Sequence, residues 1–375
     1  MKPKVLLVTA PIGAGHLRAA AAVAAALNQK PYEIPTKIIN VFDLLPPSFG
    51  RTIINCYLKI LKTMPQIYGM MYGWGNTSNL ALKGREFIYK CLARRMAESV
   101  KACQPAIIVC THALSAGLVA ALVKTGQINV PVIGVITDYV VHRLWIYPEL
   151  THYFVASEDM RQYLAKHGIP PASCTISGIP IAAEFGNLSA TRQDIAEKLG
   201  LAPDIPTILL MGGGAGVLPM EEILTACDNL PERYQFIAVA GRNRNLYYRL
   251  LEYRDKLRQQ VSVFGYVDNI HELMLVADIL VSKPGGLTSA EALASGLPLI
   301  IYRPIPGQEE ANTRYLLQQN VAVRANSPLE VKQLLALLLR KNSPQLAAMQ
   351  AAAKRCARPE AATTVAAFIT RQLGI

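Results

Sequence analysis

From KVLLVT (Lys4–Thr9) and the residues PIGAGH (Pro11–His16) that follow it, the fold class of this chain can be predicted. The apolar run predicts a buried strand, the two glycines predict a turn, and the Ala-rich run Leu17–Gln29 predicts a helix. The same succession begins again at TILLM (Thr207–Met211), which leads into GGGAG (Gly212–Gly216). A strand, a glycine turn and a helix at two places in the chain indicate an α/β fold with two doubly wound domains.

Continuous Val, Ile and Leu runs mark the other predicted strands, as is typical of parallel strands that are buried on both faces. These runs are Thr36–Val41, Ala106–Cys110, Val132–Ile136, Tyr153–Ala156, Thr175–Ser177, Phe236–Val239, Val261–Phe264, Ile279–Val281 and Pro298–Ile301. A polar stretch with Pro and Gly favours a linker over residues 183–206. It would join a domain of residues 1–182 to a second domain of residues 207–355. The Ala-rich tail predicts helix from Ser343 on.

Composition agrees with two buried cores, because 51% of the 375 residues are hydrophobic and 17% are charged. The seven cysteines have no metal-ligand spacing, so we expect reduced, packed thiols. No run reaches the roughly 18 apolar residues of a membrane span, and the first strand is not a secretory leader. We therefore expect a cytoplasmic protein that does not cross a bilayer.

The net charge of +12 is unevenly distributed. Residues 1–180 contain 18 Lys and Arg against 8 Asp and Glu, whereas residues 181–375 contain 20 against 18. An asymmetric basic surface favours an anionic partner, and a charge that serves only solubility is the alternative. Because no nucleic-acid-binding motif is present, we expect anionic lipid as the partner and no nucleic acid.

Aromatic, Met and basic residues are mixed between Gly50 and Gly75, which is typical of a segment at the surface of an anionic membrane. The residues that we expect to contact the membrane there are Arg51, Lys59, Lys62, Tyr72 and Trp74. A core-facing amphipathic helix is the alternative interpretation.

The residues Gly13–His16 follow the first predicted strand and open the first helix. Glycines let a ligand approach the backbone, and a helix N-terminus favours anions. The full dinucleotide fingerprint and the Walker motif are both missing. His16 places an ionisable group at this position, where it could take part in chemistry. Alternatively, His16 caps the helix or is a packed histidine.

Two further glycine-rich loops favour phosphate binding. Gly212–Gly216 would direct backbone N–H groups at a phosphate or a sugar, with a tight structural turn as the alternative. The run Lys283–Glu291 follows a strand, and Gly285 and Gly286 would expose the first N–H groups of a helix to a diphosphate. Glu291 would accept hydrogen bonds from a ribose, unless Thr288 and Glu291 form a capping box.

Polar residues follow two other predicted strands. The run Pro306–Asn312, with Gln308 and Glu309, suits a polyol such as a hexose; an exposed helix start is the alternative. Thr137 and Asp138 follow the strand at 132–136, where Asp138 could serve as a base or orient one. An ordinary N-cap aspartate is the alternative there.

At these residues the sequence resembles the diacylglycerol glycosyltransferase family, which includes bacterial processive diacylglycerol glucosyltransferases and plant monogalactosyldiacylglycerol synthases. It is more distantly similar to the N-acetylglucosaminyltransferase of peptidoglycan synthesis. The resemblance covers nearly the whole chain. The runs that carry it are Gly13–His16, Thr137–Asp138 with His142 and Trp145, Lys283–Glu291, and Pro306–Asn312.

The resemblance implies a GT-B fold in which the N-terminal domain holds the acceptor lipid and the C-terminal domain holds a UDP-sugar. It also implies a last helix, residues 356–375, that packs on the N-terminal domain. The implied donor-binding residues are Gly213, Gly214, Gly216, Arg242, Tyr266, Val267, Gly285, Gly286, Leu287, Thr288, Glu291, Gln308, Glu309 and Asn312. On the acceptor side the implied residues are Gly15, His142 and Trp145.

The resemblance further implies an inverting transfer of a hexose to diacylglycerol at the cytoplasmic face of the membrane. His16 is our first candidate for the base, because an imidazole titrates near neutral pH, and Asp138 is the second. Because the chain lacks Asp-x-Asp, we expect no cofactor and no required metal. Ala215 and Leu218 depart from the plant pattern, which favours UDP-glucose over UDP-galactose.

Three alternatives remain open from the sequence. The first is a transferase that moves an amino sugar to a polyprenyl-linked acceptor, and the second is a UDP-sugar epimerase of the same architecture. The third is a non-catalytic protein that binds a lipid surface.

Overall fold

The computed structural model describes residues 4–10, 13–45, 92–187, 190–214 and 216–375. The chain divides into two compact units. Unit 1 comprises Met1–Ala183, Ile305–Ala311 and Arg358–Ile375, and unit 2 comprises Glu184–Pro304 and Asn312–Ala357. Among the described residues, no helix is both long enough and apolar enough to span a bilayer.

Unit 1 is built on a sheet of six parallel strands in the order β2-β1-β3-β4-β5-β6. The strands are β1 (Val5–Thr9), β2 (Thr36–Asn40), β3 (Ile107–Cys110), β4 (Val132–Val135), β5 (His152–Val155) and β6 (Cys174–Ile176). Its helices are α1 (Ala14–Asn28), η1 (Val41–Leu44), α5 (Ala113–Lys124), η2 (Arg143–Trp145), α6 (Glu158–Lys166), η3 (Pro171–Ser173) and α15 (Ala361–Gln372). Residues 92–103 are also helical.

Unit 2 contains a second sheet of six parallel strands, in the order β12-β11-β10-β7-β8-β9. The strands are β7 (Thr207–Met211), β8 (Gln235–Val239), β9 (Gln260–Phe264), β10 (Ile279–Ser282), β11 (Leu299–Tyr302) and β12 (Ala322–Ala325). Its helices are α7 (Arg192–Lys198), α8 (Met220–Asp228), α9 (Arg244–Arg254), α10 (Ile270–Val276), α11 (Gly286–Ala294), α13 (Pro328–Leu338) and α14 (Pro344–Cys356). The short helix η4 (Ala183–Phe185) and α12 (Gln308–Gln318) run across the division between the units.

Both sheets confirm the predicted α/β fold class, and the burial of their strands gives the physical reason. All residues of β1, β3, β4, β7 and β8 are buried, which explains why each of these strands is almost entirely apolar in sequence. One core cluster in unit 1 joins strand residues to residues of α1 and α15. A second cluster, in unit 2, joins β7, β8 and β10 to α8, α9 and α13.

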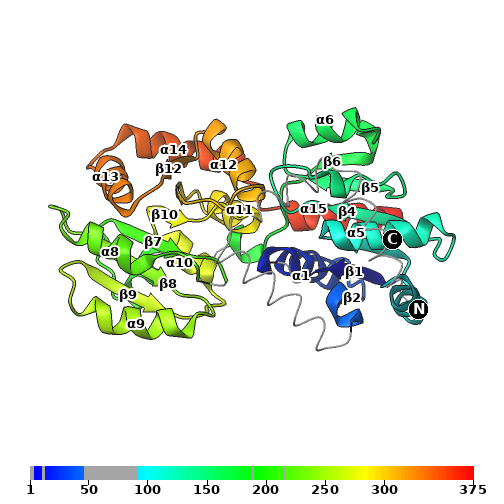
Figure 1. Cartoon of the computed structure of the whole chain (residues 1–375), viewed down its shortest axis with the longest axis horizontal. Helices are drawn as coiled ribbons and strands as arrows, with labels where there is room; N and C mark the ends of the chain where they lie inside the picture. Colours follow the sequence, from blue (N-terminus) through cyan, green and yellow to red (C-terminus); the bar gives the residue numbers. More distant parts are fainter. Residues whose placement is uncertain (1–3, 11–12, 46–91, 188–189, 215) are drawn as a thin grey trace. The chain divides into compact units, whose positions relative to one another are not determined.

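The end of the chain belongs to unit 1. Helix α15, red in Figure 1, packs against α1, which is blue. Val365, Ala366 and Ile369 of α15 are fully buried in the same cluster as Val23 and Leu27 of α1. At about 25 cal/mol per Å² of apolar surface, such burial contributes several kcal/mol to holding the last helix in place.

Residues 183–206, for which we predicted a linker, contain η4 and the helix α7. A capping box between Thr191 and Asp194 starts α7, and α7 packs against α10 in unit 2. The polar sequence of this stretch is explained by the exposed face of α7, on which Arg192 pairs with Asp278 at 2.8 Å.

Candidate active site

His16 lies within the first turn of α1, not in the turn that precedes the helix. The helix begins at Ala14, and its N-cap is Gly13 at φ 87°, without a side-chain cap. The alternative of a helix-capping histidine is therefore wrong. His16 is half-buried and follows Gly15 directly.

The Nδ1 atom of His16 is held between two residues that lie in the loops after β3 and β4. It lies 3.1 Å from the carbonyl oxygen of Thr111 and 2.6 Å from Oγ1 of Thr137. Thr111 also donates its hydroxyl to the carbonyl of His16, at 3.0 Å. A carbonyl oxygen can only accept, so Nδ1 carries the proton and the lone pair lies on Nε2.

Burial lowers the pKa of His16 to about 4, although its hydrogen bond to the Thr111 backbone acts in the opposite direction. A neutral imidazole is therefore the form present at pH 7. Such a group accepts a proton from a ligand without first having to lose one, as a general base must.

A second histidine, His112, packs against His16. The two ring centroids are 4.5 Å apart and the rings are nearly perpendicular, at 89°. His112 is the N-cap of α5: its Nδ1 accepts from the N–H of Leu114 at 3.0 Å, and Ser115 completes a capping box. Burial lowers the pKa of His112 well below 6.5, and charge on His16 would lower it further.

The strand order explains why these side chains meet. In unit 1 the order reverses between β1 and β3, and ligands of open α/β sheets bind at the carboxyl ends of the strands at such a point. His16 follows β1, Thr111 and His112 follow β3, and Thr137 follows β4. We predicted no role for Thr111, His112 or Thr137. The signal that could have identified them is their common position shortly after a buried strand.

Asp138 is buried directly after Thr137, with 8% of its surface exposed. Residues 136–142 do not begin a helix at Asp138, so an N-cap aspartate is the wrong interpretation. His142 instead caps η2, accepting from the N–H of Leu144 at 3.1 Å. Trp145 is only 4% exposed, and its carbonyl accepts from Tyr153. His142 and Trp145, which we expected on the acceptor side, are thus both buried within unit 1.

In unit 2 the glycine loop after β7 packs against the loop after β8. Gly216 has φ 58°, and a Cβ at that position would overlap the carbonyl oxygen of Ala240. Asn243 donates to the carbonyl of Gly216 at 3.2 Å, and the N–H of Arg242 donates to Gly214 at 3.1 Å. The structural-turn alternative is thus correct for Gly216, whereas a Cβ on Gly213 would face open space.

Helix α11 begins at Gly286, with Gly285 as an N-cap that has no side-chain hydrogen bond. Thr288 lies inside the helix, so the predicted alternative of a capping box with Glu291 is wrong. A Cβ on Gly285 would meet nothing within 4 Å, so open space adjoins this helix N-terminus. Glu291 and Leu287 are buried in α11. The strand order of unit 2 reverses between β7 and β10, which places both glycine loops at its ligand-binding position.

Arg242 and Tyr266 form a cation–π pair, with the guanidinium 5.0 Å from the ring centroid. Tyr266 follows β9, precedes Val267 and is 52% exposed. The pair therefore leaves an aromatic ring in solvent at the carboxyl end of the sheet of unit 2.

Helix α12 begins at Gln308, and the residues of its first turn are half-buried rather than exposed. Glu309 accepts from the N–H of Ile305 at 2.7 Å. Asn312 is fully buried and donates to the carbonyl of Pro284 at 3.1 Å. This hydrogen bond from Asn312 thus helps to hold the loop that precedes α11.

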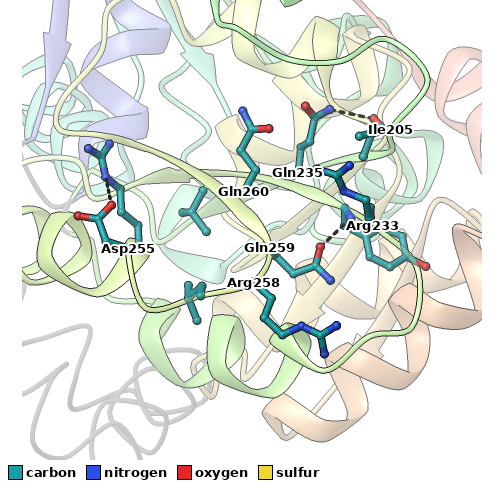
Figure 2. A pocket seen from close by; sticks show the side chains of 11 residues that line it. Ile205, Arg233, Gln235, Asp255, Arg258, Gln259 and Gln260 are labelled. Carbon is teal, nitrogen blue, oxygen red and sulfur yellow. Dashed lines mark hydrogen bonds and ion pairs between the residues drawn. The ribbon is translucent and has the colours of Figure 1, made fainter.

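The expected membrane residues Arg51, Lys59, Lys62, Tyr72 and Trp74 lie outside the described residues. A cavity of about 300 Å³ lies at the amino ends of β8 and β9, where Gln235, Gln259 and Gln260 line it together with Arg233 and Arg258 (Figure 2). Gln235 and Gln259 are bonded to backbone groups around it. None of the predicted site residues lines this cavity.

Comparisons with known proteins cover both units. The family model for monogalactosyldiacylglycerol (MGDG) synthase matches residues 16–181, and the glycosyltransferase family 28 C-terminal domain matches residues 207–365. A processive diacylglycerol beta-glucosyltransferase of Bacillus mycoides is 31% identical over 361 residues, which are 96% of this chain and 91% of that protein.

Two solved structures share the fold. The MurG of Acinetobacter baumannii has a TM-score of 0.65 at 16% identity, and the alignment covers 98% of this chain and 99% of that one. The structure of a UDP-N-acetylglucosamine 2-epimerase from Listeria monocytogenes, described as putative, also has a TM-score of 0.65 at 16% identity, with 100% and 97% covered. At this identity the likeness shows the GT-B fold alone.

Proposed function

The chain belongs to the diacylglycerol glycosyltransferase family, and from this premise we propose that it transfers a hexose from a UDP-sugar to the free hydroxyl of diacylglycerol. The product is a β-glycosyldiacylglycerol. The observation that carries this proposal is the state of His16, a neutral imidazole whose Nδ1–H is held by Thr111 and whose Nε2 lone pair can take a proton.

The reaction is a direct displacement. Nε2 of His16 removes the proton of the lipid hydroxyl while that oxygen forms a bond to the anomeric carbon. The bond from that carbon to the diphosphate breaks, and UDP leaves with the electron pair, so the anomeric configuration inverts. The carbonyl of Thr111 and the hydroxyl of Thr137 hold Nδ1–H while the ring becomes an imidazolium.

In this proposal unit 2 supplies the groups that bind the diphosphate, ribose and uracil of the donor, whereas Gln308 and Glu309 belong to unit 1. The N-terminus of α11 and the loop at Gly213 and Gly214 receive the diphosphate, because both adjoin open space and present backbone N–H groups. Arg242 offsets the charge that UDP gains on leaving. The remaining donor roles are Glu291 on the ribose, backbone at Tyr266 and Val267 on the uracil, and Gln308 and Glu309 on the hexose.

We further propose UDP-glucose as the donor and a reaction that needs no metal ion. The name of the Bacillus mycoides relative supports glucose, as does the sequence Gly216-Val217-Leu218 in the first donor loop. In support of metal independence, Arg242 and the N-terminus of α11 would offset the charge of the diphosphate in this proposal. Asp-x-Asp, the usual metal-binding sequence for a diphosphate, does not occur in the chain.

The protein works at the cytoplasmic surface of a membrane in this proposal, since its acceptor is a lipid. The excess of positive charge in residues 1–180 supports docking on anionic lipid. Electrostatic docking predicts that liposomes with anionic lipid recruit the protein, that neutral liposomes do not, and that salt weakens the recruitment.

A transfer assay tests the function. Diacylglycerol in anionic liposomes is offered with radiolabelled UDP-glucose or UDP-galactose, each in the presence of EDTA, and lipid-soluble label is measured. Labelled glycolipid from UDP-glucose, lost in His16→Ala, is the expected result. UDP release without glycolipid, or conversion of one UDP-sugar into another, would instead indicate a different acceptor or an epimerase.

A further inference from the structure

The two adjacent histidines of unit 1 have opposite tautomers. Nδ1 of His16 faces a carbonyl oxygen, which can only accept, so its proton is on Nδ1 and its lone pair is on Nε2. Nδ1 of His112 accepts from the N–H of Leu114, so the proton of neutral His112 is on Nε2. One ring therefore offers an acceptor at Nε2 and the other offers a donor.

Neither Nε2 atom has a hydrogen-bond partner among the residues that the structure describes. In both rings the Nδ1 atom is committed to backbone, which fixes the ring orientation and leaves Nε2 for a ligand. The ring centroids are 4.5 Å apart, so the two rings are in direct contact. In this proposal one oxygen bridges the two Nε2 atoms with two hydrogen bonds of about 2.8 Å each.

An alcohol is the ligand that fits this pair. Its hydroxyl group donates one proton and accepts through its lone pairs, so it satisfies an acceptor and a donor at once. A carboxylate or phosphate oxygen would satisfy only the N–H of His112 and would face the lone pair of His16. The pair thus selects a neutral hydroxyl. The hydrogen bond from Nε2–H of His112 also restricts the direction of the lone pairs on the hydroxyl oxygen.

We propose that His112 is a second catalytic residue, whose Nε2–H donates a hydrogen bond to the same acceptor hydroxyl from which Nε2 of His16 removes the proton. This inference rests on the proposed function, because the hydroxyl is that of the acceptor lipid. His112 stays neutral throughout, since protonating its Nδ1 would break the cap of α5. It orients the hydroxyl and takes no proton itself.

Two substitutions separate this role from the capping role of His112. His112→Asn keeps a good N-cap, because the Asn side-chain oxygen replaces Nδ1, but it removes the donor at Nε2. His112→Gln places an amide N–H near the former Nε2 but caps poorly. The proposal predicts that Asn retains the melting temperature and loses about tenfold in kcat/KM for the lipid, whereas Gln melts a few degrees lower and loses less activity.

A purely structural role predicts the reverse order, with Gln the less active variant, and that order would overturn the inference. Full activity in His112→Asn would overturn it as well. The wild-type protein is measured in the same assay with diacylglycerol and UDP-glucose. If the wild type makes no glycolipid, the proposed function is refuted, and this inference with it. If the wild type is active and His112→Asn is not impaired, only this inference is refuted.

Discussion

The hydroxyl of Thr137 lies 2.6 Å from Nδ1 of His16, although 121 residues separate the two in the chain. The contact joins the loop after β4 to the first turn of α1. It holds the imidazole on the side opposite to its reactive nitrogen. The orientation of the proposed base therefore depends on a hydroxyl and a carbonyl.

Thr137→Val tests the importance of that hydroxyl, since valine keeps the branched shape and removes the oxygen. We expect kcat to fall about tenfold while KM for the UDP-sugar stays unchanged, because the loss concerns only the orientation of the base. Steady-state kinetics of transfer provide the measurement. Thr151→Val is the matched control, as the hydroxyl of Thr151 bonds the backbone of Val132 in the same unit. An effect on KM alone would contradict this role of Thr137.

The pH dependence of transfer follows from the pKa of His16, which burial lowers to about 4. The base must be neutral to accept a proton, so kcat/KM should stay level from pH 7 to about pH 5 and fall as the pH drops through about 4. Initial rates in buffers of constant ionic strength would show the profile. A fall centred near 6.5, the ordinary value for histidine, would show that His16 is solvated in the working enzyme.

Stability should also decrease in acid. Burial lowers the pKa of His16, His112 and His152, so the unfolded chain binds protons near pH 6.5 that the folded chain does not yet bind. Unfolding is therefore favoured as the pH falls below about 6.5, by up to about 1.4 kcal/mol per pH unit for each such histidine, and is unaffected above it.

Thermal melts at pH 7.5 and 5.5 would measure this change in stability. His152→Phe should reduce the difference between the two melting temperatures, because the ring that stacks on Phe368 at 4.1 Å then no longer titrates. An unchanged difference would mean that His152 does not contribute. His167→Phe is the control, because His167 is an exposed histidine at the C-cap of α6.

Gly178→Ala should loosen the attachment of the C-terminal residues. Gly178 has φ 84°, and a Cβ there would overlap Cβ of Arg358. Gly168→Ala is a matched control, because Gly168 has a similar φ of 90° but faces open space. Both variants acquire about 1 kcal/mol of backbone strain, and only Gly178→Ala also displaces Arg358. Faster proteolysis of the C-terminus in Gly178→Ala alone is expected; equal behaviour of the two would contradict the contact.

The fold was predictable because buried parallel strands are continuous apolar runs, and each predicted run is a strand. Strand β12 was not predicted: its sequence AVRA is four residues long, lies at the edge of its sheet and includes Arg324. An edge strand needs less apolar sequence, so it gives a weaker signal. Helix α7 was similarly hidden, because only Ile195 and Ala196 of it are buried.

The candidate site was predictable in part. His16 and the two glycine loops could be found because each follows a strong strand directly. The pairing of His16 with Thr111 and His112 could not, because it depends on β1 lying beside β3, and strand order is not written in the local sequence. The burial of Trp145 could not be predicted either, since an aromatic residue after a strand can lie in the core or at a ligand site.

The packing of α15 on α1 has a consequence for synthesis of the protein. The first helix, which carries His16, leaves the ribosome early, yet part of its apolar surface packs against Val365, Ala366 and Ile369 of α15. Unit 1 therefore completes its core only after α15 has been synthesised, whereas every segment of unit 2 has been made before α15. Until α15 has emerged, the nascent protein exposes the flank of its own proposed catalytic helix, to which a chaperone could bind.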